Sequence, residues 1–322
     1  MFLTVLWFVV GLILLIKGGD WFVDGATGIA KRFRIPDILI GATVVSIGTT
    51  LPEVMVSATD ALAGHGQIAY GNAIGSIICN TALIAAITVT LRPSKIERKS
   101  FILPVCVFFF AAAIYSAVAY FFGEFSRIVG IILLAICAAY IGISVYTALK
   151  NAHHDETTLD EPHEKKGLAL EIVMIVIGAA IIAFGADLLV DNGIIIAEAL
   201  GVPESVIGMT FIAIGTSLPE LVTAITSIVK GHGALSLGNV IGANIFNLVL
   251  VSGVSSVVSP FSIPSEKTVF GINSSLVIDI PVMLTVMALL TVPTLISKKL
   301  TRTQGILLLV IYAAFFTVQF VI

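Results

Sequence analysis

The sequence predicts an all-α membrane protein whose ten transmembrane helices form two inverted five-helix repeats. Three observations predict this fold. The 322 residues are 58% hydrophobic and only 11% charged, whereas an average soluble domain is roughly half apolar and a quarter charged. Apolar runs of about 20 residues, the length that crosses a bilayer core of about 30 Å, recur along the chain. The chain also matches itself when it is shifted by 167 residues.

Ten apolar runs are long enough to span a bilayer. Because lipid cannot satisfy backbone N–H and C=O groups, such runs must be helices, and the alternating pattern of a barrel strand is absent. We expect no cleaved signal peptide, since the first run has neither a basic region before it nor a small-residue cleavage site. The expected spans are residues 2–29, 36–60, 69–90, 101–122, 127–149, 168–197, 203–229, 235–258, 275–296 and 303–321.

The basic residues are distributed unevenly between the connections. Fourteen of the 17 lie in odd-numbered connections, two in even-numbered ones, and Lys17 lies inside the first span. Cytoplasmic loops are enriched in Lys and Arg, so both termini are predicted to be extracytoplasmic, in a multi-pass protein of the cell membrane. The fourteen are Lys31, Arg32, Arg34, Arg92, Lys95, Arg98, Lys99, Lys150, Lys165, Lys166, Lys230, Lys298, Lys299 and Arg302.

Two sequence blocks make up most of the internal repeat. GATVVSIGTTLPEVMVS (41–57) matches GMTFIAIGTSLPELVTA (208–224) at 8 of 17 positions, and GNAIGSIICNTALI (71–84) matches GNVIGANIFNLVLV (238–251) at 7 of 14. Each repeat holds five spans, an odd number, so the second must enter the membrane from the opposite side. Inverted repeats with interrupted helices are typical of secondary transporters.

The chain therefore divides into two repeats and a connection. We expect the first five-helix repeat at 1–150, a polar cytoplasmic linker at 151–167 and the second repeat at 168–322. The linker contains His153, His154 and His163 next to acidic residues, which is compatible with a regulatory metal site. A solvated linker is the simpler interpretation.

A proline followed by a glutamate lies in the middle of spans 2 and 7. Pro52 and Pro219 cannot donate a backbone hydrogen bond, so we expect each helix to kink or unwind there and to release carbonyl groups. Glu53 and Glu220 follow directly, and a carboxylate at mid-membrane costs at least about 2.5 kcal/mol. Two carboxylates balance one divalent ion, and oxygen ligands suit hard cations such as Ca²⁺ and Na⁺. A structural ion pair is the alternative, but Lys17 cannot pair with both.

The second block of each repeat adds further polar side chains. Ser76 and Asn80 lie four residues apart and so share a helix face, and Asn247 is the repeat partner of Asn80. Their oxygens could complete a coordination shell. The neighbouring Asn72 and Asn239 suit either helix capping or gating.

Small residues and two aspartates occupy the remaining repeated positions. We expect Gly71, Gly75, Gly238 and Gly242 to allow close helix packing. Asp20 and its repeat partner Asp187 each follow a glycine-containing stretch, so we expect them to cap a half-helix or to mark a hinge.

These paired motifs resemble the sodium/calcium exchanger family of the cation/calcium antiporter superfamily, whose two repeats carry G-T-S-x-P-E/D and G-N-x-x-G-S-x-x-x-N/D motifs. The resemblance runs over essentially the whole chain. It implies ten helices, with spans 2, 3, 7 and 8 forming the ion site and spans 1 and 6 sliding as a gate.

The resemblance also implies an ion-binding role for particular residues. Glu53 and Glu220 would bind both Ca²⁺ and Na⁺, helped by the carbonyls of Thr49 and Thr216. The flanking sodium sites would use Thr50, Ser76 and the Ser46 carbonyl on one side, and Thr216, Ser217 and the Ala213 carbonyl on the other.

Two departures from the family pattern bear on the transported ions. Ala243 stands where the family often has serine, so the repeat partner of Ser76 lacks a hydroxyl and one sodium site is short of a ligand. Asn80 and Asn247 are both amides, whereas potassium-dependent relatives have an aspartate at one of these positions. Two carboxylates rather than three argue against potassium co-transport.

The sequence thus predicts an antiporter that exchanges Ca²⁺ for Na⁺ by alternating access. It predicts neither an enzyme, a resident cofactor nor a nucleic-acid partner, since there is no HExxH motif and no Ser or Asp catalytic dyad. A Ca²⁺/H⁺ antiporter is the nearest alternative, because a buried Glu can carry protons. A cation channel built from the same oxygens is a further alternative, and it would pass current without a counter-ion.

Overall fold

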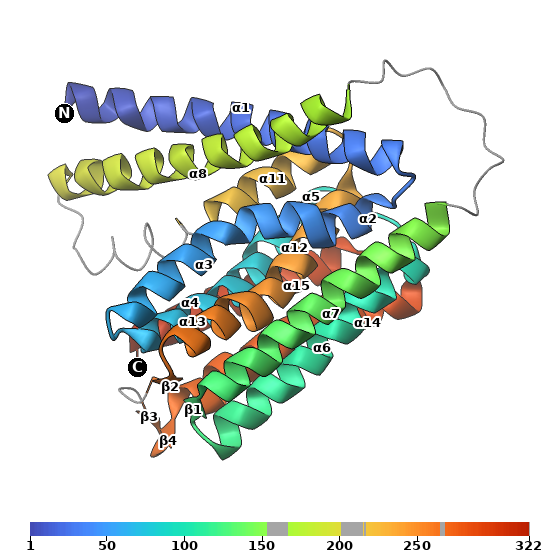
Figure 1. The fold of residues 1–322 in the computed structure, drawn as a ribbon. Coiled ribbons are helices and arrows are strands. Elements are labelled where there is room, and N and C mark those ends of the chain that lie inside the picture. Colours follow the sequence, from blue (N-terminus) through green and yellow to red (C-terminus); the bar gives the residue numbers. More distant parts are fainter. Residues whose placement is uncertain (153–166, 201–214, 216, 265–267, 322) are drawn as a thin grey trace.

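The chain forms a bundle of long membrane helices in the computed structural model, which describes residues 1–152, 167–200, 215, 217–264 and 268–321 (Figure 1). Nine helices in these ranges are long and apolar enough to cross a membrane. The tenth expected span is described only as the shorter helix Leu218–Val229. The expected linker residues 153–166, with their three histidines, lie outside the described ranges.

The first half contains the five expected spans. Spans 2 and 3 are continuous helical runs that each contain a π-helical segment, η1 or η2. The elements are α1 (Phe2–Arg32), α2 (Asp37–Ile40), η1 (Gly41–Val45), α3 (Ser46–Leu62), α4 (Gly66–Cys79), η2 (Asn80–Ala85), α5 (Ala86–Leu91), α6 (Arg98–Phe121), β1 (Glu124–Phe125) and α7 (Arg127–Ala152).

The described helices of the second half follow a similar order, with the additional elements β3, β4 and η5 before its fourth long helix. Its short strands form two-stranded ladders, β1 with β2 and β3 with β4, outside the helix bundle. The elements are α8 (Leu168–Ala199), α11 (Leu218–Val229), α12 (Gly233–Phe246), η4 (Asn247–Val251), α13 (Ser252–Val258), β2 (Phe261–Ser262), β3 (Thr268–Val269), β4 (Ile272–Asn273), η5 (Ser275–Asp279), α14 (Ile280–Ser297) and α15 (Arg302–Val321).

The odd-numbered connections meet at one end of the bundle, as the alternation of spans requires. Lys95 and Lys299 form a β-bridge, and Arg92 donates a 2.8 Å hydrogen bond to the carbonyl of Ile228. At the other end, β1 pairs with β2 and so joins the connections after α6 and α13. We call the first of these the basic end, because it carries the lysines and arginines of the odd-numbered connections.

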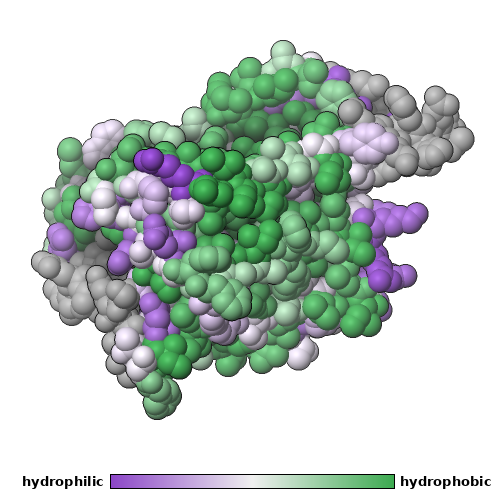
Figure 2. Space-filling view, turned by 60° about the horizontal axis from the view of Figure 1, so that its bottom comes forward, coloured by the Kyte–Doolittle hydropathy of each residue, from purple (hydrophilic) through white to green (hydrophobic). Residues whose placement is uncertain are grey.

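The surface of the bundle is largely apolar. Figure 2 shows a broad hydrophobic area, with polar side chains gathered towards the edges of the view. Many large apolar side chains are exposed, such as Phe2 at 81%, Phe121 at 82% and Ile296 at 79%. A contiguous apolar exterior is stable in lipid and not in water, so these side chains face the bilayer.

Helices α1 and α8 pack against each other as a pair beside the other helices (Figure 1). Glycines allow this contact, since a Cβ on Gly11 would lie 2.8 Å from the Gly185 carbonyl and one on Gly18 3.0 Å from the Gly178 carbonyl. The pair packs in a separate buried cluster, which includes Leu15 of α1 together with Ile40, Val45 and Leu235 from α2, η1 and α12. The larger cluster of buried residues, built from the other helices, contains no residue of α1 or α8.

The expected breaks in spans 1 and 6 are absent. Both α1 and α8 are continuous α-helices through Gly18 and Gly185, because these glycines serve the contact between the two helices. Asp20 and Asp187 therefore lie within helices, and the prediction that they cap half-helices is wrong. The alternative, that they mark a hinge, stays a prediction.

Candidate ion-binding site

Six polar side chains from both halves are buried with no hydrogen-bond partner among the described residues. Each is at most 1% exposed, although buried polar groups in folded proteins are nearly always bonded. An unpaired carboxylate in such a place is costly unless a cation neutralises it. The six are Thr50 and Glu53 of α3, Asn80 of η2, Ser217 and Glu220 at the start of α11, and Asn247 of η4.

Two of the six side chains, Glu53 and Glu220, lie close to each other. The charge of Glu220 acts directly on Glu53, and Thr49 and Thr50 of the first half lie beside the Glu220 carboxylate. The site therefore crosses the boundary between the repeats. Two adjacent buried carboxylates repel one another, so the arrangement favours a divalent cation or two monovalent ones between them.

The two prolines of the site differ in their surroundings. Pro52 lies inside α3, which is helical without interruption from Ser46 to Leu62, so the expected unwinding does not occur there. The carbonyl of Gly48, four residues earlier, loses its helical donor because proline has no N–H. Pro219 instead occupies the first turn of α11, directly after a turn at Ser217, where no helical donor is needed.

Both candidate asparagines begin a π-helical segment. Asn80 starts η2 and Asn247 starts η4, and in each half an α-helix precedes the change in winding. Single π-helical turns often mark functional sites. The sequence contains no signal for them, because one extra residue in a turn does not change the apolar character of the run.

Two expected ligands already bond within their own helices. The Ser46 hydroxyl donates to the Thr43 carbonyl at 3.2 Å, and the Ser46 carbonyl accepts from the Thr49 hydroxyl at 3.4 Å. The Ser76 hydroxyl donates to Asn72 Oδ1 at 3.4 Å. These bonds are long, so the oxygens retain lone pairs for an ion.

The structure describes nine of the eleven expected site residues. Thr216 and Ala213 lie outside the described residues. Of the nine, six are the unpartnered side chains. The elements that carry them pack against one another, η2 on α11 and η4 on α3, while Ser46, Thr49 and Ser76 lie on the same helical runs.

Asn72 and Asn239 connect helices and do not cap them. Asn72 Nδ2 donates to Ser57 Oγ at 2.8 Å. Asn239 Nδ2 donates to Thr223 Oγ1 at 2.8 Å and its Oδ1 accepts from Thr49 at 3.3 Å. Asn239 thereby joins α12 to α11 of its own half and to α3 of the other.

Asn244 forms a second polar link between the halves, which the sequence did not predict. Asn244 Nδ2 donates to Thr81 Oγ1 at 2.7 Å and contacts the Met287 sulfur at 3.2 Å. Asn244 lies three residues before Asn247 on the same helical run, and its repeat partner is Ile77. The presence of asparagine in one repeat and isoleucine in the other was the only sequence feature that could have indicated this link.

The expected glycine packing is present in α12. A Cβ on Gly238 would collide with the Ile38 carbonyl, and one on Gly242 with the Ser46 hydroxyl, whereas no described atom lies within 4 Å of such a Cβ on Gly71 or Gly75. The prediction is confirmed for α12. For α4 it stays a prediction, because the repeat partners of Ile38 and Ala42, at positions 205 and 209, lie outside the described residues.

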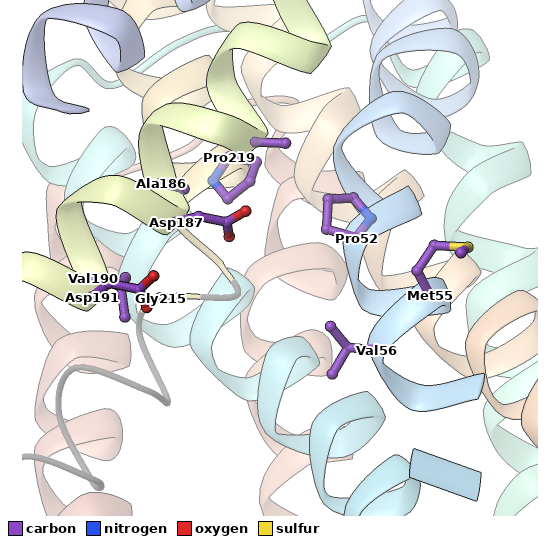
Figure 3. A pocket seen from close by; sticks show the side chains of 10 residues that line it. Pro52, Met55, Val56, Ala186, Asp187, Val190, Asp191, Gly215 and Pro219 are labelled. Carbon is purple, nitrogen blue, oxygen red and sulfur yellow. The ribbon is translucent and has the colours of Figure 1, made fainter. Parts of the chain in front are cut away.

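A cavity of about 340 Å³ lies beside the two prolines. Figure 3 shows Pro52, Met55 and Val56 of α3 on one side and Asp187 and Asp191 of α8 on the other. Glu53 and Glu220 directly follow the two prolines that line the cavity, but both glutamates are fully buried and neither lines it.

The described residues contain no group of three His, Cys, Asp or Glu side chains that could hold a metal ion. The ligand set is instead carboxylate, hydroxyl and amide oxygen, which suits Ca²⁺ and Na⁺ and suits transition metals poorly. The site fits a hard cation as transported substrate.

An inverted-repeat helix bundle with a buried two-carboxylate site defines a multi-pass membrane ion transporter, and not an enzyme. The family model described as "Sodium/calcium exchanger protein" matches residues 3–146 and 170–321. The chain belongs to this family.

Relatives and solved structures agree with this assignment. The chain is 30% identical over 347 residues to the sodium/calcium exchanger MaX1 of Methanosarcina acetivorans, covering 97% of each chain. It is 35% identical over 312 residues to a membrane protein of Methanocaldococcus jannaschii, covering 95% of this chain and 94% of the other. The sodium-calcium exchanger NCX_Mj, soaked with 2.5 mM Na⁺ and 0.1 mM Sr²⁺, is similar with a TM-score of 0.79 and 33% identity, over 97% of each chain.

Proposed function

We propose that the chain is an antiporter that exchanges Ca²⁺ for Na⁺ across the membrane by alternating access. The observation that carries the proposal is the cluster of buried side chains without partners around Glu53 and Glu220. A pair of carboxylates with hydroxyl and amide oxygens is a ligand set for a hard divalent cation. The relatives named as sodium/calcium exchangers support the choice of ions.

Charge balance explains how such a site couples two ions. One Ca²⁺ neutralises Glu53 and Glu220, and sodium ions compete for the same oxygens. With either load bound, the site is nearly neutral and the α1–α8 pair can move across it. The empty site keeps two charges in a low-dielectric environment, which opposes that movement. Because the loaded site can move and the empty site cannot, one ion crosses only in exchange for the other.

The sodium ions are proposed to bind on both sides of the central pair. Thr50, Ser76 and the Ser46 carbonyl would serve one side, with the Thr49 carbonyl as a central ligand. Ser217, Thr216 and the Ala213 carbonyl would serve the other. Ala243 supplies no hydroxyl opposite Ser76, so the two sodium sites are unequal.

The basic end is proposed to face the cytoplasm, which places both termini outside. The odd-numbered connections that meet at this end carry most of the lysines and arginines. The proposed boundaries remain 1–150 for the first repeat, 151–167 for the linker and 168–322 for the second, with α7 extending through Ala152.

A Ca²⁺/H⁺ antiporter is the second candidate. The observation that favours it is that both carboxylates are fully buried without a cationic partner among the described residues, a setting in which a carboxyl group readily takes up a proton. In this case the same two glutamates would carry protons in place of sodium.

Uptake of ⁴⁵Ca²⁺ into proteoliposomes distinguishes the candidates. An outward sodium gradient should drive uptake in the unmodified protein, and a pH gradient of equal size should not. Glu53→Gln and Glu220→Gln should each abolish the sodium-driven uptake. Uptake driven only by the pH gradient would favour the second candidate, and calcium current without any counter-ion would identify a channel.

A further inference from the structure

The α1–α8 pair contacts the two halves of the bundle unequally. On one side, α1 packs closely on α11, where a Cβ on Gly19 would lie 2.8 Å from Val222 Cγ1 and 2.9 Å from Thr226 Oγ1. The positions that correspond to Gly19 and Val222 in the other repeat are Ala186 and Met55. The closed surface between α1 and α11 therefore has an equivalent between α8 and α3.

The equivalent surface is less closely packed. Helices α8 and α3 contact each other, but Ala186 of α8 and Met55 of α3 both line the cavity of about 340 Å³, and Met55 is 66% exposed. Inverted repeats supply two pseudo-equivalent states, each of which closes one of these two surfaces. The described residues thus adopt the state in which α1–α11 is closed and α8–α3 is the more open surface.

Lys230 bridges α11 and α1 at the closed surface. Lys230, at the end of α11, lies with Nζ 2.7 Å from Asp24 Oδ1 and 3.3 Å from Asp20 Oδ1. It also donates a 2.9 Å hydrogen bond to the Asp20 carbonyl oxygen. Three contacts from one ammonium group join α1 of the moving pair to α11 at the basic end.

The open surface has the same acids but no lysine. Asp187 and Asp191 are the repeat partners of Asp20 and Asp24, and both line the cavity. The repeat partner of Lys230 is Ala63, which is exposed just after the end of α3. When the second surface closes, its aspartates meet no equivalent cation at this position.

We propose that Lys230 is a one-sided latch: a positioning residue that stabilises the state closed between α1 and α11, with no counterpart in the opposite state. The ion site itself is symmetric in its carboxylates, so the bias between the two states comes from a contact outside it. The proposal deepens the proposed function, since it assumes alternating access. It concerns the position of the α1–α8 pair and not the transported ions.

The test measures the two surfaces separately with single-cysteine probes in purified protein in detergent, where the sidedness of the membrane does not matter. Met55→Cys reports the open surface and Val222→Cys the closed one. The exposed native Cys106 is replaced by alanine, while Cys79 and Cys137 are buried. Modification rates with a hydrophilic maleimide are compared as the ratio of the Met55→Cys rate to the Val222→Cys rate.

Lys230→Met should lower this ratio by about two- to fivefold, the scale of a partly exposed ion pair. Ala63→Lys should lower it as well, because it gives the opposite state a latch of its own. Lys95→Met, which removes a charge at the same end without touching α1, should leave the ratio unchanged. None of these readouts requires sodium or calcium transport, so failure here is distinct from failure of the proposed function.

Three results would overturn the latch. The first is an unchanged ratio in Lys230→Met. The second is faster labelling of both probes, which shows that the lysine only holds the fold together. A ratio that rises in Ala63→Lys also contradicts the proposal, because the added lysine would then not stabilise the opposite state.

Discussion

The two halves of this chain carry the same motifs and use them in different local structures. Pro52 lies inside the uninterrupted α3, whereas Pro219 begins α11 after a turn. The glycines of α12 pack against the other half, whereas no described atom lies within 4 Å of a Cβ on those of α4. The motif residues are shared, so these differences come from the surroundings of each motif and not from its sequence.

The residues proposed to bind ions are matched between the two halves, whereas those proposed to set the conformation are not. The carboxylates, and the asparagines that begin π-helical segments, are matched between the halves. The lysine, the packed glycines and the cavity are not matched. Substitutions at matched positions should therefore have equal effects in both halves, and those at unmatched positions should not.

The largest expected effect is the loss of either central carboxylate. Glu53→Gln and Glu220→Gln should each lower calcium uptake by about 100-fold or more, the change that a loss of roughly 3 kcal/mol of binding produces. The two variants should be equally defective. Sodium-driven ⁴⁵Ca²⁺ flux in proteoliposomes measures this, and a large difference between them would break the symmetry of the site.

Thermal unfolding provides the control for folding. Without cations, the two buried carboxylates have no partner among the described residues, so each glutamine variant should unfold at the same or a higher temperature than the unmodified protein. A strongly lowered melting temperature would show instead that the glutamates hold the structure together.

Glycine substitutions should separate the halves by stability. Gly238→Ala should lower the free energy of unfolding by about 1 to 3 kcal/mol, because its Cβ would collide with the Ile38 carbonyl. At the repeat partner, the new Cβ of Gly71→Ala meets no described atom within 4 Å, so this variant should be neutral or stabilising by up to about 1 kcal/mol. Melting temperatures in one detergent compare them, and equal losses would contradict the packing difference.

The two asparagines should contribute equally to calcium binding. Asn80→Ala and Asn247→Ala each remove a buried amide that has no partner among the described residues. Each should raise the Ca²⁺ concentration for half-maximal uptake by about tenfold, the equivalent of roughly 1.4 kcal/mol. Asn244→Ala is the matched control: its amide is bonded to Thr81, and it should change stability more than calcium affinity.

The smallest expected effect concerns the unequal sodium sites. Ser76→Ala should raise the sodium concentration for half-maximal exchange by a few-fold, since one hydroxyl ligand contributes about 1 kcal/mol. Ala243→Ser should lower it by a similar factor. Sodium titrations of calcium uptake measure both, and identical behaviour of the two variants would remove the asymmetry.

Much of the fold was predictable from the sequence. The apolar runs predicted nine of the ten spans to within a few residues, because lipid leaves the backbone no alternative to a helix, and the tenth is described only in its second part. The self-match at 167 residues predicted the inverted repeats, and the family model matches each half separately. The prediction at Asp20 and Asp187 failed because a glycine in a membrane helix can serve close packing as well as a break.

The site was predictable in its residues but not in its winding or its connections. Glu53 and Glu220 were identifiable because an ionisable side chain in an apolar run is conspicuous. The π-helical turns at Asn80 and Asn247 leave no trace in composition. The contact between Lys230 and Asp24 joins residues 206 positions apart, and no local pattern indicates such a pairing.

The most direct test of the two-carboxylate site is equilibrium binding of ⁴⁵Ca²⁺ to the purified protein, titrated with Na⁺. If one pair of glutamates serves both ions, sodium should displace calcium fully and competitively, and neither Glu53→Gln nor Glu220→Gln should bind calcium in the same range. Calcium that stays bound at saturating sodium, or that binds normally to either variant, would contradict the shared site.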